Sequence, residues 1–389
     1  MMFQFNIPTH AVFGAGQLNH LHELPLPGKK ALIITSNGKS TKENGYLSRT
    51  EEQLRSARVT FLLYDKIEAN PLRETVTNGG RIASAGNVDF LVALGGGSVL
   101  DAAKGIAVVA TNGGDVWDYI TNGTGGKKKI ANTPLPIVAI PTTAGTGSET
   151  DAGGVITNPD TQEKTPIKDR SLFPKLAIID PELMVSVPPR FTAYQGFDAL
   201  FHNIEGYLSN KSNAVSEMVA REAIQRIAAY LPQAVAEGKN IKARTEVAFA
   251  SYLGGIEMVL SSTISHHSLE HSLSSFHQEL PHGAGLIMLS HAYFSYLIDT
   301  HEMDDRFIQL AHYLGNESAT GPEEFLLALE ELKKACDVQD LHMRDYNITP
   351  SEFPQMAHIA QSAMAFLFAN DRVTLSEEAC VAIYKKAYC

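Results

Sequence analysis

Short apolar runs alternate with helix-like segments through the first half of the chain, and this alternation constrains the fold more than any other feature. The runs lie at residues 30–35, 59–64, 88–94, 136–140 and 176–179, each bounded by turn residues or charge. Continuous apolar runs of this length are typical of strands that are covered on both faces, and the stretches between them suit crossover helices. We therefore predict an α/β fold built on a mostly parallel sheet.

The pattern changes at Val187-Pro188-Pro189. Beyond these residues the β-branched runs stop and helical periodicity takes over, as in residues 215–231. The chain has 389 residues, 44% of them apolar, which is enough to bury two ordinary cores. We therefore predict two domains, an α/β domain over residues 1–188 and an all-α domain over residues 189–389.

Charge and cysteine content exclude several classes of partner. The formal net charge is -11 and the only basic run is at residues 127–129, so the chain offers no electrostatic footprint for nucleic acid or an anionic membrane. No stretch approaches the ~20 apolar residues that would span a bilayer, and residues 1–10 lack the features of a secretory signal. Cys336, Cys380 and Cys389 form no CxxC pair and fit a reducing compartment. We expect a cytoplasmic protein whose partner is a small molecule.

Glycine-rich turns follow two of the predicted strands. Leu94-Gly95-Gly96-Gly97-Ser98 comes between a strand and a helical pattern, and glycine lets backbone amides approach a pyrophosphate at the helix N-terminus. The spacing is neither GxGxxG nor a P-loop, and a tight turn capped by Ser98 would look the same. A second turn at residues 141–148 supplies four hydroxyls and two glycines. Two such turns border one crevice in a parallel sheet, which favours a nucleotide site.

Histidines and one aspartate recur at helical spacing in the second half. Asp198 and His202 are four residues apart in a helix-like segment, which puts them on one helix face, although such a pair alone is more often a surface contact. His267 and His271 share a face in the same way. His266 points roughly 100° away and His277 has no partner at helical spacing, so we interpret both as surface or packing residues.

A site of one carboxylate and three neutral imidazoles suits Fe(II) or Zn(II) and leaves positions for a substrate oxygen. The Irving–Williams order favours zinc, so metal availability would decide between the two. Residues 267–271 also spell HxxEH, the inverted zinc-protease signature in which Glu270 would be the base. A match of five residues arises easily by chance, and a protease would leave both glycine-rich turns unused.

Ordered motifs along nearly the whole chain resemble those of the iron-containing (group III) alcohol dehydrogenases, which are related to glycerol dehydrogenase and dehydroquinate synthase. The resemblance implies a dinucleotide-binding α/β domain followed by an all-helical domain that carries the metal. The motifs are FGAG at 13–16, GGGSVLDAAK at 95–104, PTTAGTGSE at 141–149, IDPEL at 179–183, and the segments 197–209, 267–286 and 375–388.

The resemblance also implies roles for individual residues. The metal ligands would be Asp198, His202, His267 and His282. His271 would lie near the nicotinamide, and we expect it to relay the released proton because imidazole titrates near neutral pH. The pyrophosphate would contact Gly96, Gly97, Ser98 and Asp101, and the rest of the cofactor channel would be lined by Asn70, Thr142, Thr143, Thr146 and Lys164.

One departure from the family bears on the choice between NAD and NADP. Members that use NAD tend to carry an aspartate after the first long strand for the ribose hydroxyls, whereas residues 35–40 here read TSNGKS and contain no acid. Gly38, Lys39 and Ser40 could accept a 2'-phosphate that a carboxylate would repel. We therefore expect NADP(H) to be favoured over NAD(H).

The implied reaction is hydride transfer between a small alcohol or aldehyde and NAD(P)(H), with Fe²⁺ or Zn²⁺ as Lewis acid. The alternatives are a glycerol-dehydrogenase-like or dehydroquinate-synthase-like enzyme on the same fold. The latter should carry a basic cluster near the metal helices, and residues 192–209 contain neither Lys nor Arg. Family analogy suggests a homodimer or a larger homo-oligomer.

Overall fold

The computed structural model describes residues 3–388, which form two compact units. Residues 6–143 and 147–186 make up the α/β unit, and residues 3–5, 144–146 and 187–388 make up the helical unit. The boundary expected after residue 188 lies close to this division, but the sequence did not assign residues 3–5 or 144–146 to the helical unit. The prediction of an α/β region followed by a mostly helical one is confirmed.

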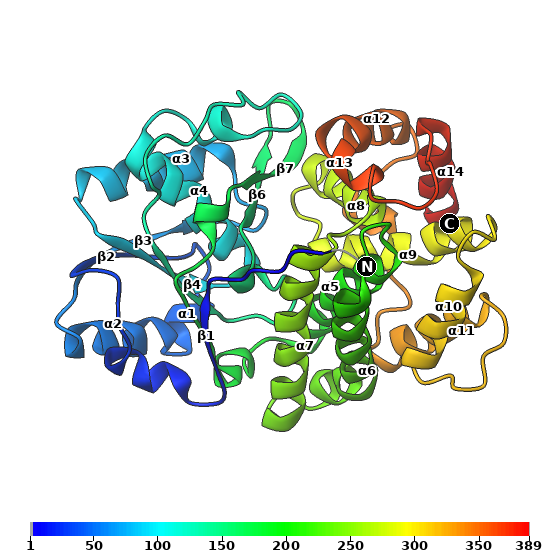
Figure 1. Cartoon of the computed structure of the whole chain (residues 1–389), viewed down its shortest axis with the longest axis horizontal. Helices are drawn as coiled ribbons and strands as arrows, with labels where there is room; N and C mark the ends of the chain where they lie inside the picture. The colour runs from blue at the N-terminus through cyan, green and yellow to red at the C-terminus, as the bar shows by residue number, and fades with distance from the viewer. Residues whose placement is uncertain (1–2, 389) are drawn as a thin grey trace. The chain divides into compact units, whose positions relative to one another are not determined.

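Six parallel strands form the sheet of the α/β unit in the order β1-β8-β5-β4-β2-β3 (Figure 1). Strands β4 and β5 lie in its middle and are buried along their whole length, which explains why their sequences are apolar without alternation. The strands are β1 (His10–Phe13), β2 (Lys30–Ser36), β3 (Thr60–Ile67), β4 (Phe90–Gly95), β5 (Ile137–Pro141) and β8 (Leu176–Ile179).

Three strands were not expected from the sequence. One is β1, and the others are β6 (Gly153–Asn158) and β7 (Glu163–Lys168), which form a separate antiparallel hairpin. The sequence GGVITN begins with two glycines, and EKTPIK contains charges and a proline, so neither has the composition of a typical strand. The hairpin matters for the site because it carries Lys164, one of the predicted cofactor residues, on β7 opposite Thr157.

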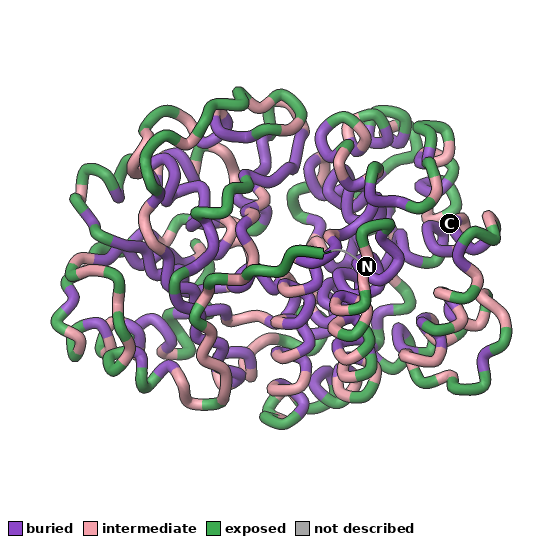
Figure 2. Tube along the Cα trace, viewed as in Figure 1, coloured by how far each residue is buried: buried purple, intermediate pink, exposed green. Residues whose placement is uncertain are grey.

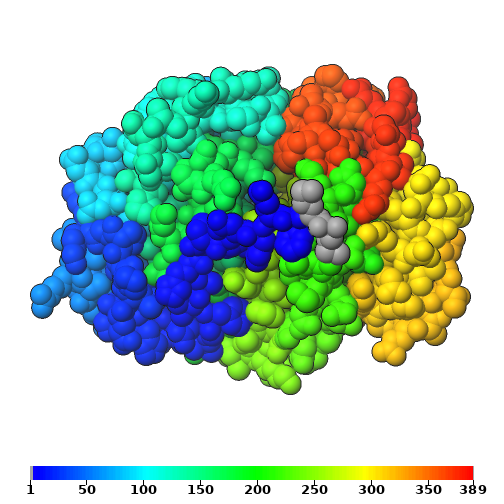
Figure 3. Space-filling view, in the orientation of Figure 1, coloured from blue at the N-terminus to red at the C-terminus, as the bar shows by residue number. Residues whose placement is uncertain are grey.

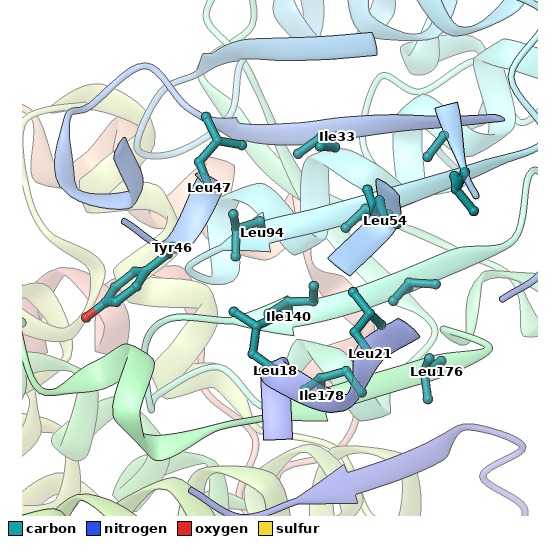
Figure 4. Close-up of a cluster of buried hydrophobic side chains, with 14 of the residues drawn as sticks. Leu18, Leu21, Ile33, Tyr46, Leu47, Leu54, Leu94, Ile140, Leu176 and Ile178 are labelled. Atoms are coloured by element: carbon teal, nitrogen blue, oxygen red, sulfur yellow. The ribbon is translucent and has the colours of Figure 1, made fainter. Parts of the chain in front are cut away.

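Helices cover both faces of the sheet, and alternate side chains of each strand supply the two cores. On one face, Ile33, Leu94 and Ile140 pack against η1 and α2, as Figure 4 shows. On the other face, α4 packs on β4, β5 and β2, and α3 packs on α4 and on the edge strand β3. The helices of this unit are η1 (Gln17–Glu23), α1 (Ser40–Glu43), α2 (Tyr46–Ser56), α3 (Arg73–Ala85), α4 (Gly97–Asn112), η2 (Val116–Tyr119), η3 (Ser148–Thr150), η4 (Arg170–Leu172) and η5 (Pro181–Met184).

The helical unit is built around α5, which begins at Pro189, where a proline supplies a suitable φ and loses no hydrogen bond. Helices α6 and α7 pack against one side of α5, and α9 packs against α5 and α8. The bounds are α5 (Pro189–Leu208), α6 (Ala214–Ala236), α7 (Ile241–Leu260), α8 (Ser265–Phe276), α9 (His282–Ile298), α10 (Asp304–Tyr313), α11 (Glu324–Ala335), η6 (Met343–Tyr346), α12 (Phe353–Ala363), α13 (Ala365–Phe368) and α14 (Glu377–Ala387).

Helix α8 is polar in sequence but buried in the structure. Apart from Phe276, its residues are all buried, and Figure 2 shows the interior of this unit in purple. Ser268 and Ser272 donate to the carbonyl oxygens of Ala360 and Met356 on α12, which satisfies their hydroxyls without water. Helices α12 and α14, orange and red in Figure 3, lie side by side on the surface beyond α8. The interior of the helical unit can therefore hold polar side chains whose hydrogen bonds are satisfied.

Within residues 3–388 no single helix is long and apolar enough to cross a membrane. Only α7 and α8 taken together, bent by 109° at their junction, have the required length and composition.

Candidate active site

Helix α5 carries the first two of the predicted metal ligands. Asp198 and His202 lie one turn apart, and both are buried, with 4% and 5% of their surface exposed. The Nε2 atom of His202 is 3.6 Å from Oδ1 of Asp198. The four-residue spacing therefore puts both side chains at one point inside the helical unit.

Two more histidines approach the same carboxylate oxygen from α8 and α9. The Nε2 atoms of His267 and His282 are each 3.5 Å from Oδ1 of Asp198. The rings of His202 and His267 are stacked with centroids 4.5 Å apart. Three imidazole nitrogens thus surround one carboxylate oxygen, and all four predicted ligands come together.

This arrangement fits a divalent metal ion. Ligand atoms about 2.0–2.2 Å from a tetrahedral ion lie roughly 3.3–3.6 Å from each other, which matches the observed separations. Oδ1 of Asp198 and Nε2 of His267 are buried, and neither has a hydrogen-bond partner within residues 3–388. Buried polar atoms without a partner are costly, so the site is arranged for a cation rather than for its own hydrogen bonds.

The charges around the site favour the protonation states that metal binding needs at two of these residues. Burial raises the pKa of Asp198, but the charges of His202 and His282 outweigh it and hold this pKa well below its usual value. Burial lowers the pKa of His202 to about 4. Burial also lowers the pKa of His267, but the Glu205 carboxylate outweighs this and raises it to about 10. A metal ion must therefore displace a proton from His267.

Two buried glutamates lie behind the ligand histidines. Oε1 of Glu205 accepts a hydrogen bond from Nδ1 of His267 at 2.5 Å, and Oε2 of Glu270 accepts one from Nδ1 of His282. Both carboxylates are fully buried. Burial raises the pKa of Glu205, but His267 and His266 outweigh it and lower this pKa to about 2. The sequence had given Glu205 no role and Glu270 only that of a protease base.

The remaining histidines of α8, and His277 just after it, lie near this centre or beside it. The ring of His271 is 5.2 Å from that of His282 and 6.3 Å from that of His267, and the residue is 7% exposed. His266 is fully buried, with Nδ1 2.8 Å from Glu205 and Nε2 3.1 Å from the Leu286 carbonyl oxygen. His277 contacts Glu352 at 3.1 Å.

The two glycine-rich turns meet in the α/β unit. Gly95 ends β4, and α4 begins at Gly97. A Cβ atom on Gly95 would lie 2.5 Å from Val99, and one on Gly96 would lie 3.1 Å from Thr143, so both positions require glycine or a displaced neighbour. The Thr142 amide donates to the Gly95 carbonyl oxygen at 2.9 Å. Because β4 and β5 are adjacent and parallel, these turns share one edge of the sheet.

The other predicted cofactor residues are spread over the α/β unit, with one exception. Ser98 lies in the first turn of α4, Gly38 follows β2, and Ser40 begins α1. Asn70 and Lys164 are brought near each other, because the Thr157 amide donates to the carbonyl oxygen of Pro71 while Thr157 pairs with Lys164. Thr146 groups with the helical unit.

Asp101 does not present a free carboxylate at the turn. It accepts hydrogen bonds from Ser148 Oγ at 2.6 Å and from the Val155 amide at 3.1 Å, and burial raises its pKa to about 6. Lys104 had been given no role from the sequence. It is 1% exposed and donates hydrogen bonds to Ser148, Asp151 and the Gly153 carbonyl oxygen. Lys104 and Asp101 thus tie α4 to the segment that follows the second turn. The sequence pattern that could have indicated this is their spacing of three residues, which puts Asp101 and Lys104 on one face of α4.

Comparisons with known proteins cover the whole chain. Residues 8–181 match the model for "Iron-containing alcohol dehydrogenase", and residues 192–388 match "Fe-containing alcohol dehydrogenase family, C-terminal". The 1,3-propanediol dehydrogenase of Klebsiella pneumoniae is 34% identical over 100% of this chain and 99% of its own length. The NAD-dependent methanol dehydrogenase of Bacillus methanolicus is 34% identical over 86% of this chain and 87% of its own length.

A solved structure has the same fold over its full length. The archaeal halo-thermophilic alcohol dehydrogenase from a Red Sea brine pool superimposes with a TM-score of 0.94 at 30% sequence identity, covering 100% of this chain and 99% of that one. With a parallel sheet that ends in glycine-rich turns and a helical unit that holds a cluster of potential metal ligands, the chain belongs to the iron-containing alcohol dehydrogenase family.

Proposed function

We propose that this NAD(P)-dependent alcohol dehydrogenase interconverts short uncharged alcohols and their aldehydes, with NADP(H) preferred, at a metal centre held by Asp198, His202, His267 and His282. The observation that carries the proposal is the convergence of three Nε2 atoms on Oδ1 of Asp198 at 3.5–3.6 Å. A divalent ion held by these four residues would supply Lewis acidity toward the oxygen of the alcohol or aldehyde, and the nicotinamide would supply or accept the hydride.

The residues around the centre support an uncharged substrate. Helix α5 carries no Lys or Arg between Thr192 and Leu208, so the helix that holds two ligands offers no cation for a phosphate or a carboxylate. This argues against a dehydroquinate-synthase-like substrate. Both Fe²⁺ and Zn²⁺ fit the site: the matched family is named for iron, and a set of one carboxylate and three imidazoles also suits zinc.

His271 is the proposed proton relay. Its ring lies 5.2 Å from that of His282, near enough to the centre to pass a proton onward, yet it is a separate residue from the four ligands. The test is His271→Phe, measured as kcat against pH with a saturating alcohol. We expect a lower kcat and a displaced acidic limb, and an unchanged rate and pH profile would remove this role.

The preference for NADP(H) is supported by the end of β2. Asn37, Gly38 and Lys39 are exposed there and include no carboxylate. The acid on the neighbouring strand, Asp65, is paired with Lys42 Nζ at 2.5 Å and with Lys66 at 3.0 Å. A 2'-phosphate would meet a lysine, a hydroxyl and backbone amides and no free negative charge.

One panel tests the main proposal. Protein reconstituted with Fe(II) or with Zn(II) is assayed with short alcohols and aldehydes, each with NADPH and with NADH or their oxidised forms. We expect activity with both cofactors and a higher kcat/KM with NADP(H). A tenfold advantage of NADH would overturn the cofactor preference, and activity that does not depend on added metal would overturn the metal centre.

Assembly into a homodimer or larger homo-oligomer in the cytoplasm is also proposed. Edge strand β3 supports it, because Leu62 and Leu63 are 37% and 41% exposed on a strand that pairs only with β2 among the described residues. Light scattering coupled to gel filtration, and fractionation of cells, test the two parts.

A further inference from the structure

Glu270 lies between proposed metal ligands in the structure but is not one of them. It lies on α8 between His267 and His271, yet its carboxylate accepts a hydrogen bond from His282, which begins α9. The side chain is fully buried. A Cβ atom on Gly285 would lie 2.8 Å from both Cγ and Oε1 of Glu270, so the backbone of α9 closes over the carboxylate. Glu270 is therefore held in place from the helix that carries its partner.

Glu205 plays the corresponding part for His267. Its Oε1 accepts from Nδ1 of His267 at 2.5 Å and from Nδ1 of His266 at 2.8 Å. Its Oε2 accepts from the backbone amide of Ile264 at 3.0 Å. With these contacts the carboxylate of α5 fixes the start of α8 as well as the imidazole.

A carboxylate at Nδ1 decides which nitrogen of an imidazole can bind a metal. A neutral imidazole has one proton, and an ionised carboxylate can only accept, so the proton sits on Nδ1 and the lone pair on Nε2. In His267 and His282 it is Nε2 that faces Oδ1 of Asp198. His202 differs, because its Nδ1 has no hydrogen-bond partner in the described part of the chain. Two of the three ligand histidines are thus oriented by carboxylates.

We propose that Glu205 and Glu270 are positioning residues that hold the Nδ1–H groups of His267 and His282 and thereby direct both Nε2 atoms at the metal site. Glu270 has the larger effect on retention, because the side chain of His282 is 22% exposed while those of His202 and His267 are 6% and 4% exposed. This inference rests on the proposed metal centre. Neither glutamate is one of the four proposed ligands.

Cobalt(II) titration tests the role of Glu270 without any assay of activity. Visible d–d bands of bound Co²⁺ report the geometry of the ligands, and competition with a chelator gives the affinity. Glu270→Leu keeps the volume but removes the acceptor, so we expect binding weaker by about 10–100-fold and altered bands. Glu270→Gln keeps an acceptor and loses the charge, so its affinity should lie between those of Glu270→Leu and the wild type.

Glu257→Gln is the matched control. Glu257 is also a fully buried glutamate of the helical unit, but it accepts from Ser261 Oγ at 2.6 Å and contacts no ligand histidine within the described residues. The control should bind Co²⁺ like the wild type. If Glu270→Gln and Glu270→Leu both match Glu257→Gln in affinity and spectrum, the positioning role is wrong.

Failure of the metal centre itself has a different signature. Asp198→Ala should abolish the Co²⁺ spectrum, because it removes the oxygen on which the three histidines converge. A wild-type protein that binds no Co²⁺, or an Asp198→Ala variant that binds it normally, would overturn the proposed centre and the positioning role together. Loss of binding in Asp198→Ala alongside normal binding in both Glu270 variants would overturn only the positioning role.

Discussion

Gly145 lies directly against the carboxylate of a metal ligand. A Cβ atom at this position would be 3.0 Å from Oδ2 of Asp198 and 3.0 Å from the Gln195 carbonyl oxygen on the preceding turn of α5. The Ala144 amide also faces Gln195 Oε1 at 3.4 Å. The second glycine-rich turn is thus fitted to the metal helix within the helical unit, and a side chain here would have to displace Asp198 or the turn.

Gly145→Ala is therefore expected to impair catalysis without unfolding the protein. A misplacement of a reacting group by a fraction of an ångström up to 1 Å costs up to about 100-fold in rate, so we expect kcat/KM to fall about 10-fold to 100-fold. Steady-state kinetics, with circular dichroism to check the fold, measure the effect. Gly321→Ala is the control, because its nearest neighbour is the flexible end of Glu323. Equal kinetics for both variants would contradict the expectation.

Gly38→Asp tests the cofactor preference at a single residue. The added Cβ would be 3.4 Å from Ser36 Oγ, an ordinary contact, and the position is exposed, so the change should leave the fold intact. The new carboxylate would accept from ribose hydroxyls and repel a 2'-phosphate. We expect the ratio of kcat/KM for NADPH over NADH to fall at least about tenfold, since 1.4 kcal/mol corresponds to that factor.

Two outcomes would contradict this expectation. An unchanged ratio would mean that the end of β2 does not contact the adenosine ribose, and a ratio that falls only through loss of activity with both cofactors would mean that the turn had been distorted. Lys39→Ala is the complementary variant, because it should weaken NADPH binding and leave NADH binding nearly unchanged.

Helical spacing could predict part of the ligand cluster. It could not predict the rest, because the remaining contacts join different helices. Asp198 and His202 share a face of α5, and the same face continues to Glu205 seven residues after Asp198, so Glu205 could have been found by extending the pattern. Glu270 could not, because its partner His282 lies on the next helix, beyond a loop whose path the sequence does not determine. Which residues of α8 and α9 come into contact depends on the tertiary structure and not on spacing along one helix.

At the scale of elements, two consecutive glycines bring α3 and α4 together. A Cβ on Gly80 would lie 2.4 Å from Val109 Cβ, and one on Gly79 would lie 2.6 Å from Ile106. In an exposed helix, replacing glycine by alanine gains about 1 kcal/mol. Here the clash is with the branched side chain and backbone of α4, and overpacking a core costs about 1–3 kcal/mol. The cost of overpacking should therefore exceed the gain in helix propensity.

Gly80→Ala is accordingly expected to destabilise the α/β unit by up to roughly 2 kcal/mol, the difference between these two terms. Denaturant unfolding followed by circular dichroism measures it. Ser84→Ala, an exposed position on the same helix, is the control and should be neutral or slightly stabilising. A Gly80→Ala protein as stable as Ser84→Ala would show that α3 can move away from α4 without cost.

Four of the five predicted strands are those whose burial leaves a continuous apolar run, whereas β3 has such a run but is an edge strand on which Leu62 and Leu63 are exposed. Strands β2, β4 and β5 are covered on both faces by helices, so local composition carries the signal. Strands β6 and β7 depend on each other rather than on composition, with Pro166 within one strand and two glycines within the other. A hairpin of this kind is stabilised by its pairing and by contact with α4, neither of which is local in sequence.

At the scale of the whole molecule, buried carboxyl groups make stability depend on pH. Burial raises the pKa of Glu257 to about 8, and burial likewise raises those of Glu149 and Asp371 to about 7. A carboxyl group whose pKa is raised on folding binds its proton more tightly in the folded protein. Its contribution to stability is complete below the unfolded value of about 4.5 and is lost as the pH rises through the folded value.

Glu257→Gln isolates one of these groups. We expect the variant to be about as stable as the wild type near pH 5 and more stable than it near pH 9, by up to a few kcal/mol, because ionised Glu257 is buried and the amide is neutral. Denaturant unfolding of both proteins at the two pH values gives the difference. A difference that does not change with pH would mean that Glu257 is solvated or paired when it ionises.

The metal centre joins α5 to two helices, α8 and α9, that lie far from it in sequence. Its four proposed ligands come from α5, α8 and α9, all within the helical unit, and none from the α/β unit. A ligand that binds only the folded state stabilises it, by about 2.7 kcal/mol at a concentration 100 times Kd. For a unit of this size each kcal/mol shifts Tm by about 2–4 °C. Chelation should therefore lower the Tm of the helical unit by roughly 5–10 °C.

Calorimetry of the metal-loaded protein before and after dialysis against EDTA measures this shift, and Asp198→Ala supplies the control. The variant lacks the oxygen on which the histidines converge, so EDTA should leave its Tm unchanged. The transition of the α/β unit should respond to NADP(H) and not to EDTA, because the glycine turn at residues 95–97 lies in that unit and none of the four ligands does. An equal EDTA shift in Asp198→Ala would place the stabilising metal elsewhere in the protein.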